Sequence, residues 1–232
     1  EIIDLPAVAK LAHKAGAQFI VDNVFATPLL QRPLEMGADI IVYSATKHID
    51  GQGRCLGGAV LGRKSFISDV LHPYLRNTGP SLSPFNAWLL LKGMETLDLR
   101  LERQCRTAAE VVSALSPHPA VQTVLYPFAE NHPQRELAQR QMKQGGSLIT
   151  FDMKGGKDAA FRFLNALGLV RLSNNLGDSK TLATHPATTT HSRLTPEARA
   201  GIGISDGLIR LSIGLESTVD IINDLTQALK KS

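Results

Sequence analysis

Two short apolar runs, each followed by a polar residue, constrain the fold of this chain more than any other feature of its sequence. The runs are FIV at 19–21, which leads into Asp22, and IIVY at 40–43, which leads into Ser44. Because both runs are continuously apolar, they predict strands covered on both faces, as in a mostly parallel α/β sheet. Such sheets bind ligands outside the carboxyl ends of their strands. Asp22 and Ser44 are therefore predicted to lie at a ligand-binding edge.

The segments around these runs alternate between helix and strand. A helix is predicted over roughly 5–15, with Asp4 as its N-cap and Pro6 near its first turn. A short helix is predicted around 28–36, and GGAVLG at 57–62 is predicted to form a further strand. This alternation predicts an α/β domain.

A long helix is predicted to follow, and the pattern then changes. Apolar side chains recur at steps of three and four from Leu90 to Leu115, which indicates one amphipathic helix. SPHPAV at 116–121 ends that helix. Two domains are therefore predicted, a first at 1–108 that includes the connecting helix and a smaller α+β domain at 109–232.

The second domain is predicted from strands that are interleaved with helices. The predicted strands are VQTVLYP (121–127), GSLITFDM (146–153) and GLIRLSIGL (207–215), and the predicted helices lie near 133–143, 157–167 and 217–230. Ser217 is predicted to be the N-cap of the last helix, since Asp220 follows it three residues later.

Composition and charge argue against several classes of protein. The 232 residues carry a net charge of +4 and no run of five like charges, so nucleic-acid binding is not indicated. No apolar run approaches the roughly 18 residues that a membrane span needs. Cys55 and Cys105 lack the spacing of a metal site or a disulfide framework, which predicts a reducing, cytoplasmic setting. The spacing of His185 and His191 also disfavours a metal site.

Lys47 follows Ser44 by three residues in the stretch SATKHIDGQGR, and the prediction of chemistry depends on it. A lysine with a lowered pKa attacks carbonyls and can hold pyridoxal 5′-phosphate (PLP) as a Schiff base. PLP also needs hydroxyls or backbone amides for its phosphate and a carboxylate beside its pyridine nitrogen. Ser44, Thr46 and Asp22 could supply these groups. Judged from residue types alone, a surface lysine, strand-end hydroxyls and a turn carboxylate are an equal alternative.

Four segments in order along the chain form a recognisable set. They are VDNVFATP (21–28), SATKHIDGQGRCLGG (44–58), NNLGDSKTLATHPATTTH (174–191) and LIRLSIGLE (208–216). The chain resembles, over essentially its whole length, the Cys/Met-metabolism family of PLP-dependent enzymes. The resemblance implies the aspartate-aminotransferase-like fold, fold type I, with a mostly parallel α/β sheet domain and a smaller α+β C-terminal domain. It also implies PLP as the cofactor.

Matched position by position, the resemblance implies a role for several residues. Lys47 matches the lysine that forms the Schiff base and moves protons between substrate carbons. Asp22 matches the carboxylate that pairs with the pyridine nitrogen, and Ser44 and Thr46 match the phosphate ligands.

Arg210 matches the family's arginine that binds the substrate α-carboxylate, a task suited to a planar fork of donors. Strand alternation predicts independently that Arg210 lies on the face opposite Ile209 and Leu211. A structural ion pair would also fit that position.

Two departures from the broad family pattern resemble its sulfhydrylase branch. DGQGR (50–54) stands where γ-synthases and γ-lyases carry NGH, and Asn175 stands where they carry serine and would reach toward lysine and substrate. The implied reaction is γ-replacement on O-succinyl-L-homoserine with sulfide, which gives L-homocysteine for methionine biosynthesis. Cystathionine γ-synthase and O-acetylhomoserine sulfhydrylase activities stay open, as does an inactive fragment.

The resemblance also implies parts that this sequence lacks. A Gly-rich phosphate turn, a tyrosine that stacks on the pyridine ring and phosphate ligands from a neighbouring subunit would all precede Glu1. The chain is therefore expected to be the C-terminal part of an enzyme that assembles as a homotetramer of tight dimers. Arg54 is expected to form a structural salt bridge, with neutralisation of a succinyl carboxylate as the alternative. Thr188 to Thr190 are expected to line the substrate entrance, and Cys105 to pack in the helix stripe.

Overall fold

The computed structural model describes residues 1–232, which divide into two compact units. Unit 1 comprises 1–98 and 136–144, and unit 2 comprises 99–135 and 145–232. The assignment of 1–108 and 109–232 to a cofactor-binding and a small domain stays a prediction. No helix of the structure is both long enough and apolar enough to cross a membrane.

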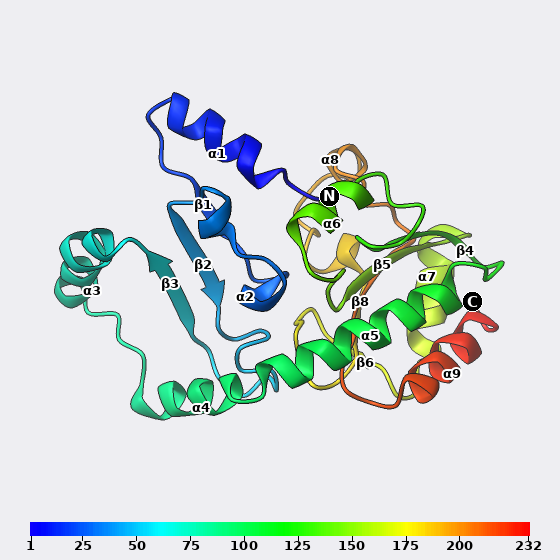
Figure 1. The fold of residues 1–232 in the computed structure, drawn as a ribbon. Helices are drawn as coiled ribbons and strands as arrows, with labels where there is room; N and C mark the ends of the chain where they lie inside the picture. Colours follow the sequence, from blue (N-terminus) through cyan, green and yellow to red (C-terminus); the bar gives the residue numbers. More distant parts are fainter. The chain divides into compact units, whose positions relative to one another are not determined.

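Unit 1 is built on a three-stranded sheet in the order β1-β2-β3. The strands are β1 (Ile20–Asp22), β2 (Ile40–Ser44) and β3 (Gly58–Gly62). β1 and β2 pair in parallel, as their apolar runs predict, whereas β3 runs antiparallel to β2 (Figure 1). The chain passes from β2 to β3 through a loop without a crossover helix. Parallel neighbours need such a crossover, so a direct loop is consistent with antiparallel pairing.

The apolar runs predict that both faces of the sheet are covered, and this holds only for the central strand. In β2, Ile40 and Ile41 point to opposite faces and both are buried. On β1 and β3, however, Ile20 is 55% exposed and Val60 is 39% exposed. The face that carries Ile20 and Val60 is therefore partly open in the structure, and the predicted coverage of both faces is wrong for β1.

Two of the helices of unit 1 begin at a side-chain N-cap, Asp4 for the first and Ser83 for the fourth. They are α1 (Leu5–Lys14), α2 (Thr27–Leu30), α3 (His72–Thr78), α4 (Pro84–Met94) and, apart from its first residue, α6 (Arg135–Gln141). Asp4 caps α1 as predicted, because its Oδ1 accepts a hydrogen bond of 3.0 Å from the N–H of Ala7. The Gln141 side chain accepts from the N–H of Leu5 and donates to the carbonyl of Ile3, both at 2.8 Å. These bonds join α6 to the start of α1.

The long helix predicted from the stripe at 90–115 is wrong as a single element. The structure has α4, which ends at Met94, and a separate α5 (Leu97–Leu115). Gly93 and Thr96 both have low helix propensity, and a hydrophobic stripe does not reveal such a local break. From Leu101 to Leu115 the stripe is buried as predicted, with Cys105 only 2% exposed.

Unit 2 contains a five-stranded sheet in the order β4-β5-β8-β7-β6. The strands are β4 (Val121–Leu125), β5 (Leu148–Met153), β6 (Arg171–Leu172), β7 (Leu182–Thr184) and β8 (Leu208–Ser212). All neighbours are antiparallel except β6 and β7. The sequence predicts β4, β5 and β8, but β6 and β7 are too short to produce a period-2 pattern.

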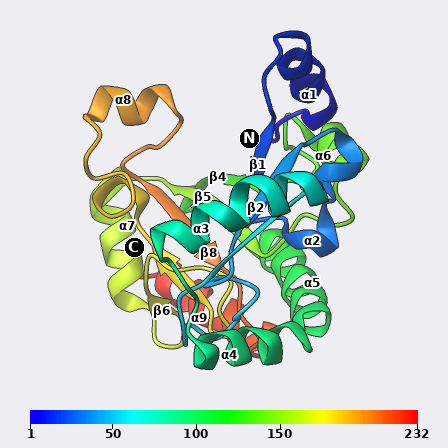
Figure 2. The ribbon, with the colours of Figure 1, turned by 90° about the vertical axis from the view of Figure 1, so that its left-hand side faces the viewer.

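Helices cover one face of this sheet and enclose its core. They are α5, α7 (Gly156–Ala166) and α9 (Thr218–Leu229), and α7 packs on α9 and on the sheet (Figure 1). Phe151 of β5 meets Phe163 of α7 edge to face, and Ile209 of β8 is completely buried in the same core. Ser217 precedes α9 as its predicted N-cap, but its side chain makes no capping hydrogen bond. A further helix, α8 (Pro196–Gly201), lies on a long excursion between β7 and β8 (Figure 2).

Asp224 of α9 fastens the chain that follows α7. Its two carboxylate oxygens accept hydrogen bonds of 2.8–2.9 Å from the N–H groups of Gly168, Leu169 and Val170. Burial acts to raise the pKa of Asp224, but these bonds and one from Gln227 together lower it below its ordinary value. The ionised side chain therefore stabilises unit 2.

Replacing Asp224 by asparagine is expected to lower the free energy of unfolding at neutral pH by about 2–3 kcal/mol, since an amide group would then face N–H donors. The ordinary pKa is 3.8 and the folded value is lower. The contribution is therefore complete above the ordinary pKa and is lost as the pH falls through the folded one. Urea unfolding followed by circular dichroism should show the difference from wild type narrowing as the pH falls below the ordinary pKa of 3.8. Asp220→Asn, exposed on the same helix, is the control, and an equal loss in both variants would contradict the prediction.

Candidate active site

The pairing of β1 with β2 brings Asp22 and Ser44 to one face of the sheet of unit 1. Asp22 lies opposite Val42, and Ser44 follows Val42 by two residues. Partner residues in a parallel pair point to the same face, and so do residues two apart on one strand. This is the partly open face, on which Asp22 is exposed and Ser44 half-buried. The carboxylate and the hydroxyl are thus displayed together at the carboxyl ends of neighbouring strands.

Lys47 lies in a tight turn that begins as β2 ends. Its N–H donates to the carbonyl of Ser44 at 3.2 Å, and its own carbonyl accepts from Gly51 at 2.8 Å. Gly51 and Gly53 have φ angles of 70° and 65°, values at which a Cβ would be strained. The glycines that follow the lysine are therefore required by the backbone of this turn.

The hydroxyl of Thr46 contacts the backbone of Gly57 at the start of the return to β3. Thr46 Oγ1 accepts a hydrogen bond of 3.1 Å from the N–H of Gly57 and donates a longer one of 3.4 Å to its carbonyl. A donor bond of that length is weak, so the hydroxyl proton could be redirected to a bound anion at little cost. The role of Thr46 as a phosphate ligand stays a prediction.

A buried carboxylate that the sequence did not predict closes the lysine turn. Asp50 is completely buried. Its oxygens accept hydrogen bonds from the N–H of Arg54 at 2.6 Å and from Arg54 Nε at 2.9 Å. Arg54 also donates to the carbonyl of Asp50 at 3.0 Å. The structural salt bridge expected of Arg54 is confirmed, and the acidic and basic residues four apart were the available signal for it.

Helix α4 supports the lysine turn through a glycine. A Cβ placed on Gly93 would overlap the carbonyl oxygen of Ile49 and would lie 3.0 Å from that of Asp50. On the other side of the turn, a Cβ on Gly57 would lie 2.6 Å from a methyl group of Leu90. The backbone of α4 can therefore approach the turn closely only because residue 93 is glycine.

Replacing Gly93 by alanine is expected to displace the lysine turn and to cost about 1–3 kcal/mol of folding stability through overpacking. Weaker PLP binding than in wild type should accompany this loss. Thermal unfolding and a fluorescence titration with PLP measure the two effects. Gly201→Ala is the matched control, since nothing lies within 4 Å of the added Cβ there. Unchanged stability and unchanged affinity in Gly93→Ala would contradict the prediction.

Arg210 of β8 lies in unit 2 with a buried donor that has no partner. Its Nη2 donates to the carbonyls of Asn174 at 2.9 Å and Asn175 at 3.2 Å, whereas its Nε is buried and makes no hydrogen bond. Burial lowers the pKa of the guanidinium, which nevertheless remains charged in proteins. The predicted strand alternation is confirmed, since Ile209 and Leu211 face the core. The structure records no ion pair for Arg210, so the structural alternative gains no support.

Asn175 contributes its backbone to this arrangement through the carbonyl that Arg210 contacts. Its own N–H donates to Ser173 Oγ at 3.1 Å. Across the sheet, Arg210 is paired with Thr150 of β5 on one side and Thr184 of β7 on the other. The predicted reach of the Asn175 side chain toward lysine and substrate stays a prediction.

His185 is buried among hydrogen-bond partners of unit 2. Its Nε2 lies 2.8 Å from the carbonyl oxygen of Asp206 and can only donate to it, so Nδ1 accepts from the hydroxyl of Thr188 at 2.9 Å. Both ring nitrogens are therefore engaged. Thr189 adds a hydrogen bond of 2.8 Å from its hydroxyl to the His185 carbonyl. These bonds explain the polar residues of HPATTTH as parts of a tight turn.

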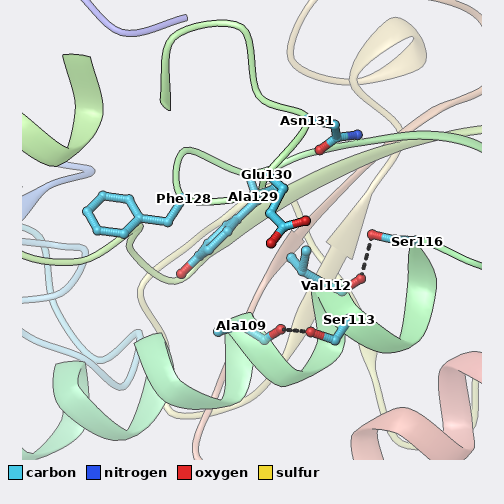
Figure 3. Close-up of a pocket in the computed structure, with 9 residues that line it drawn as sticks. Ala109, Val112, Ser113, Ser116, Phe128, Ala129, Glu130 and Asn131 are labelled. Atoms are coloured by element: carbon cyan, nitrogen blue, oxygen red, sulfur yellow. Dashed lines mark hydrogen bonds between the residues drawn. The ribbon is translucent and has the colours of Figure 1, made fainter. Parts of the chain in front are cut away.

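A half-open cavity of about 480 Å³ lies elsewhere in unit 2, between α5 and the segment after β4 (Figure 3). None of the predicted site residues lines it. The hydroxyls of Ser113 and Ser116 donate to carbonyls of their own helix, those of Ala109 and Val112. Glu130 is exposed at its rim. Tyr126, a buried residue of its lining, donates its hydroxyl to the carbonyl of Gly146 at 3.0 Å. The candidate chemistry therefore lies with the strand ends rather than with this cavity.

Residues 1–230 match the family model described as Cys/Met metabolism PLP-dependent enzyme. The chain is 50% identical over 232 residues to O-succinylhomoserine sulfhydrylase of Mycobacterium tuberculosis, an alignment covering 98% of this chain and 57% of that protein. It is 46% identical over 233 residues to L-methionine γ-lyase of Fusobacterium nucleatum subsp. polymorphum, with 100% of this chain and 59% of the relative covered.

The fold of the chain is also similar to that of solved structures. A crystal structure of cystathionine γ-synthase from Xanthomonas oryzae pv. oryzae superposes with a TM-score of 0.96 at 41% identity. The alignment covers 100% of this chain and 60% of that one. The chain thus spans less than two thirds of the length of each of these proteins. Fold type I, expected from the sequence motifs, is confirmed.

Proposed function

This chain belongs to the Cys/Met metabolism family of PLP-dependent enzymes, and on that premise we propose that it binds PLP and catalyses γ-replacement on O-succinyl-L-homoserine. Sulfide is the proposed nucleophile and L-homocysteine, a precursor in methionine biosynthesis, the proposed product. One observation carries the cofactor assignment: Asp22 and Ser44 share an open sheet face, and Lys47 lies in the turn that starts at Ser44. The identity of 50% to a sulfhydrylase supports the choice of substrate.

The residues present suit the groups of PLP. The carboxylate of Asp22 would hold the proton on the pyridine nitrogen, and its anchor is already set, because Oδ1 accepts a hydrogen bond of 3.1 Å from the N–H of Val24. The hydroxyls of Ser44 and Thr46 would donate to the phosphate. Lys47 Nζ would bind the aldehyde. PLP when bound supplies the electron sink that stabilises negative charge on the substrate carbon.

The protein would contribute orientation and proton transfer. Lys47 Nζ would remove the proton from the substrate α-carbon and move protons along the carbon chain. Arg210 would orient the substrate, because its unpartnered Nε–H is placed to donate to a carboxylate in a buried setting. The Asn174 and Asn175 carbonyls would keep the guanidinium in place.

An absorption spectrum of the purified protein, taken before and after borohydride reduction, tests the cofactor assignment. We expect a visible band that borohydride abolishes, and peptide mapping should then find the label on Lys47. No band after addition of PLP would favour the non-catalytic alternative, an inactive fragment of such an enzyme.

Product analysis separates the activities within the family. O-succinyl-L-homoserine with sulfide should give homocysteine. Cystathionine formed preferentially from added cysteine would identify a γ-synthase, and a keto acid formed without any nucleophile would identify a γ-lyase. O-acetyl-L-homoserine in place of the succinyl ester tests the acyl group.

A cytoplasmic location and a tetramer built as a dimer of dimers are also proposed, and light scattering measures the oligomeric state.

A further inference from the structure

A buried asparagine next to Asp22 makes four side-chain hydrogen bonds. Asn23 is 2% exposed. Its Nδ2 lies 3.0 Å from the carbonyl oxygens of Thr27 and Gln31 and 3.0 Å from the hydroxyl oxygen of Tyr43. Its Oδ1 accepts a hydrogen bond of 3.0 Å from Gln31 Nε2. Both ends of the amide are therefore engaged, and its orientation is fixed by its partners.

These bonds join residues that adjoin the predicted cofactor ligands. Asn23 follows Asp22 on leaving β1, and Tyr43 precedes Ser44 on β2. Burial raises the pKa of the Tyr43 phenol, while the hydrogen bond from Asn23 lowers it in part. The phenol thus remains a neutral partner. One side chain consequently links the ends of both strands that carry candidate ligands.

The same turn contains the one residue other than glycine with a positive φ in the structure. Thr27 has φ of 60° and is 2% exposed. A β-branched residue in the left-handed region is strained. It persists only where its surroundings over-determine the conformation, which is common at functional sites. Here the N–H of Thr27 donates to the carbonyl of Asn23 at 2.9 Å, and its Oγ1 accepts from the N–H of Leu29 at 3.2 Å.

This turn also sets the direction of the Asp22 carboxylate. Asp22 is exposed and would otherwise sample several rotamers, but its Oδ1 accepts a hydrogen bond of 3.1 Å from the N–H of Val24. Val24 lies between Asn23 and Thr27, so the bonds of Asn23 fix the position of this N–H. Groups that act in chemistry need such support from residues that are themselves locked.

We propose that Asn23, Gln31, Tyr43 and the strained Thr27 form a clamp that holds the Asp22 carboxylate in the direction from which it acts on the cofactor. All four are thus positioning residues. The inference rests on the proposed function, because it assigns to Asp22 the pyridine nitrogen of PLP. It adds that the backbone strain at Thr27 is maintained for that purpose.

Thr27→Gly gives the sharpest test, because a positioning role and a purely structural role of Thr27 predict different affinities for PLP. Glycine relieves the positive φ but removes the hydrogen bond that Oγ1 accepts from the N–H of Leu29. The two effects oppose each other, so the unfolding temperature of the protein without PLP should change little. If the clamp positions Asp22, the dissociation constant for PLP should nevertheless rise about tenfold, the loss expected from about one hydrogen bond. PLP affinity equal to that of wild type would overturn the proposal.

Gln31→Met removes the hydrogen bond from the Gln31 side chain to Asn23 Oδ1 and keeps the length of the side chain. The matched control is Gln227→Met in unit 2, which removes a hydrogen bond of 2.6 Å from Gln227 Nε2 to the carbonyl of Ala166. Both variants should lose stability, but only Gln31→Met should weaken PLP binding and shift the pH titration of the visible band. If both variants changed PLP binding and the pH titration equally, Gln31 would have a purely structural role and the proposal would be overturned.

Wild-type protein separates the two possible failures. If wild type binds no PLP, the proposed function fails and the clamp's role fails with it. If wild type binds PLP and either clamp variant binds it as tightly as wild type, only the clamp is refuted.

Discussion

Lys47→Ala is expected to abolish the attachment of PLP that borohydride reduction makes permanent, and to reduce kcat by at least about a thousandfold, since a general acid–base group contributes roughly 10²–10⁴ in rate. The loss combines two functions of one amine, because Nζ both binds the aldehyde and moves protons. The backbone of the turn is held by bonds of Lys47 N–H and C=O that alanine retains. Folding should therefore be little affected.

Lys47→Arg separates the charge of the side chain from its chemistry. Arginine keeps the positive charge but cannot form the same linkage or give up a proton at neutral pH. We expect it to be as inactive as Lys47→Ala, and Lys10→Ala on the exposed side of α1 to behave as wild type. Mass spectrometry after borohydride reduction, together with steady-state rates, measures both properties. Borohydride labelling that persists in Lys47→Ala would assign the linkage to another residue.

Arg210→Lys is expected to lower kcat/KM for acyl-homoserine by a factor of about 10²–10³, because truncating one side of a buried hydrogen-bonded charge pair costs roughly 2–5 kcal/mol. Lysine keeps the charge but cannot reproduce a guanidinium that donates to two carbonyls through Nη2 and presents Nε–H to a ligand. Most of the effect should lie in KM, since the α-carboxylate is present in the substrate as well as in the transition state.

The control for this variant is Arg171→Lys, on the exposed strand β6 of the same sheet. Circular dichroism and PLP titration should be close to wild type for both variants, since Arg210 is not assigned to the cofactor. A fall in kcat alone with KM unchanged would contradict the carboxylate-binding role. Equal kinetics of the Arg210 and Arg171 variants would remove Arg210 from the site.

Strands with buried apolar side chains could be predicted from the sequence. The runs before Asp22 and Ser44 predicted both strands and the edge at which they meet, because buried parallel strands are continuously apolar. The alternation around Arg210 was predicted for a similar reason. The motifs supplied what periodicity could not, the roles of the individual residues.

Features that depend on side-chain partners distant in sequence could not be predicted. Asp50 and Asn23 are polar residues beside turns, where sequence alone indicates exposure, yet both are buried because their partners satisfy them. The close approach of Gly93 of α4 to the carbonyl of Ile49 is another feature of this kind. A one-dimensional pattern contains no such distance.

The in-register pairing of β1 with β2 has a consequence for how this site can diverge. Inserting one residue inside β1 would turn the Asp22 side chain toward the face of Val21, which is only 8% exposed. A shift by two would restore its direction. The connection between β1 and β2 lies outside the strands, so its length can change by an odd or an even number of residues without turning Asp22 to the other face. Remote relatives should therefore be sought by the odd or even position of the acid within its strand rather than by a constant number of residues between acid and lysine.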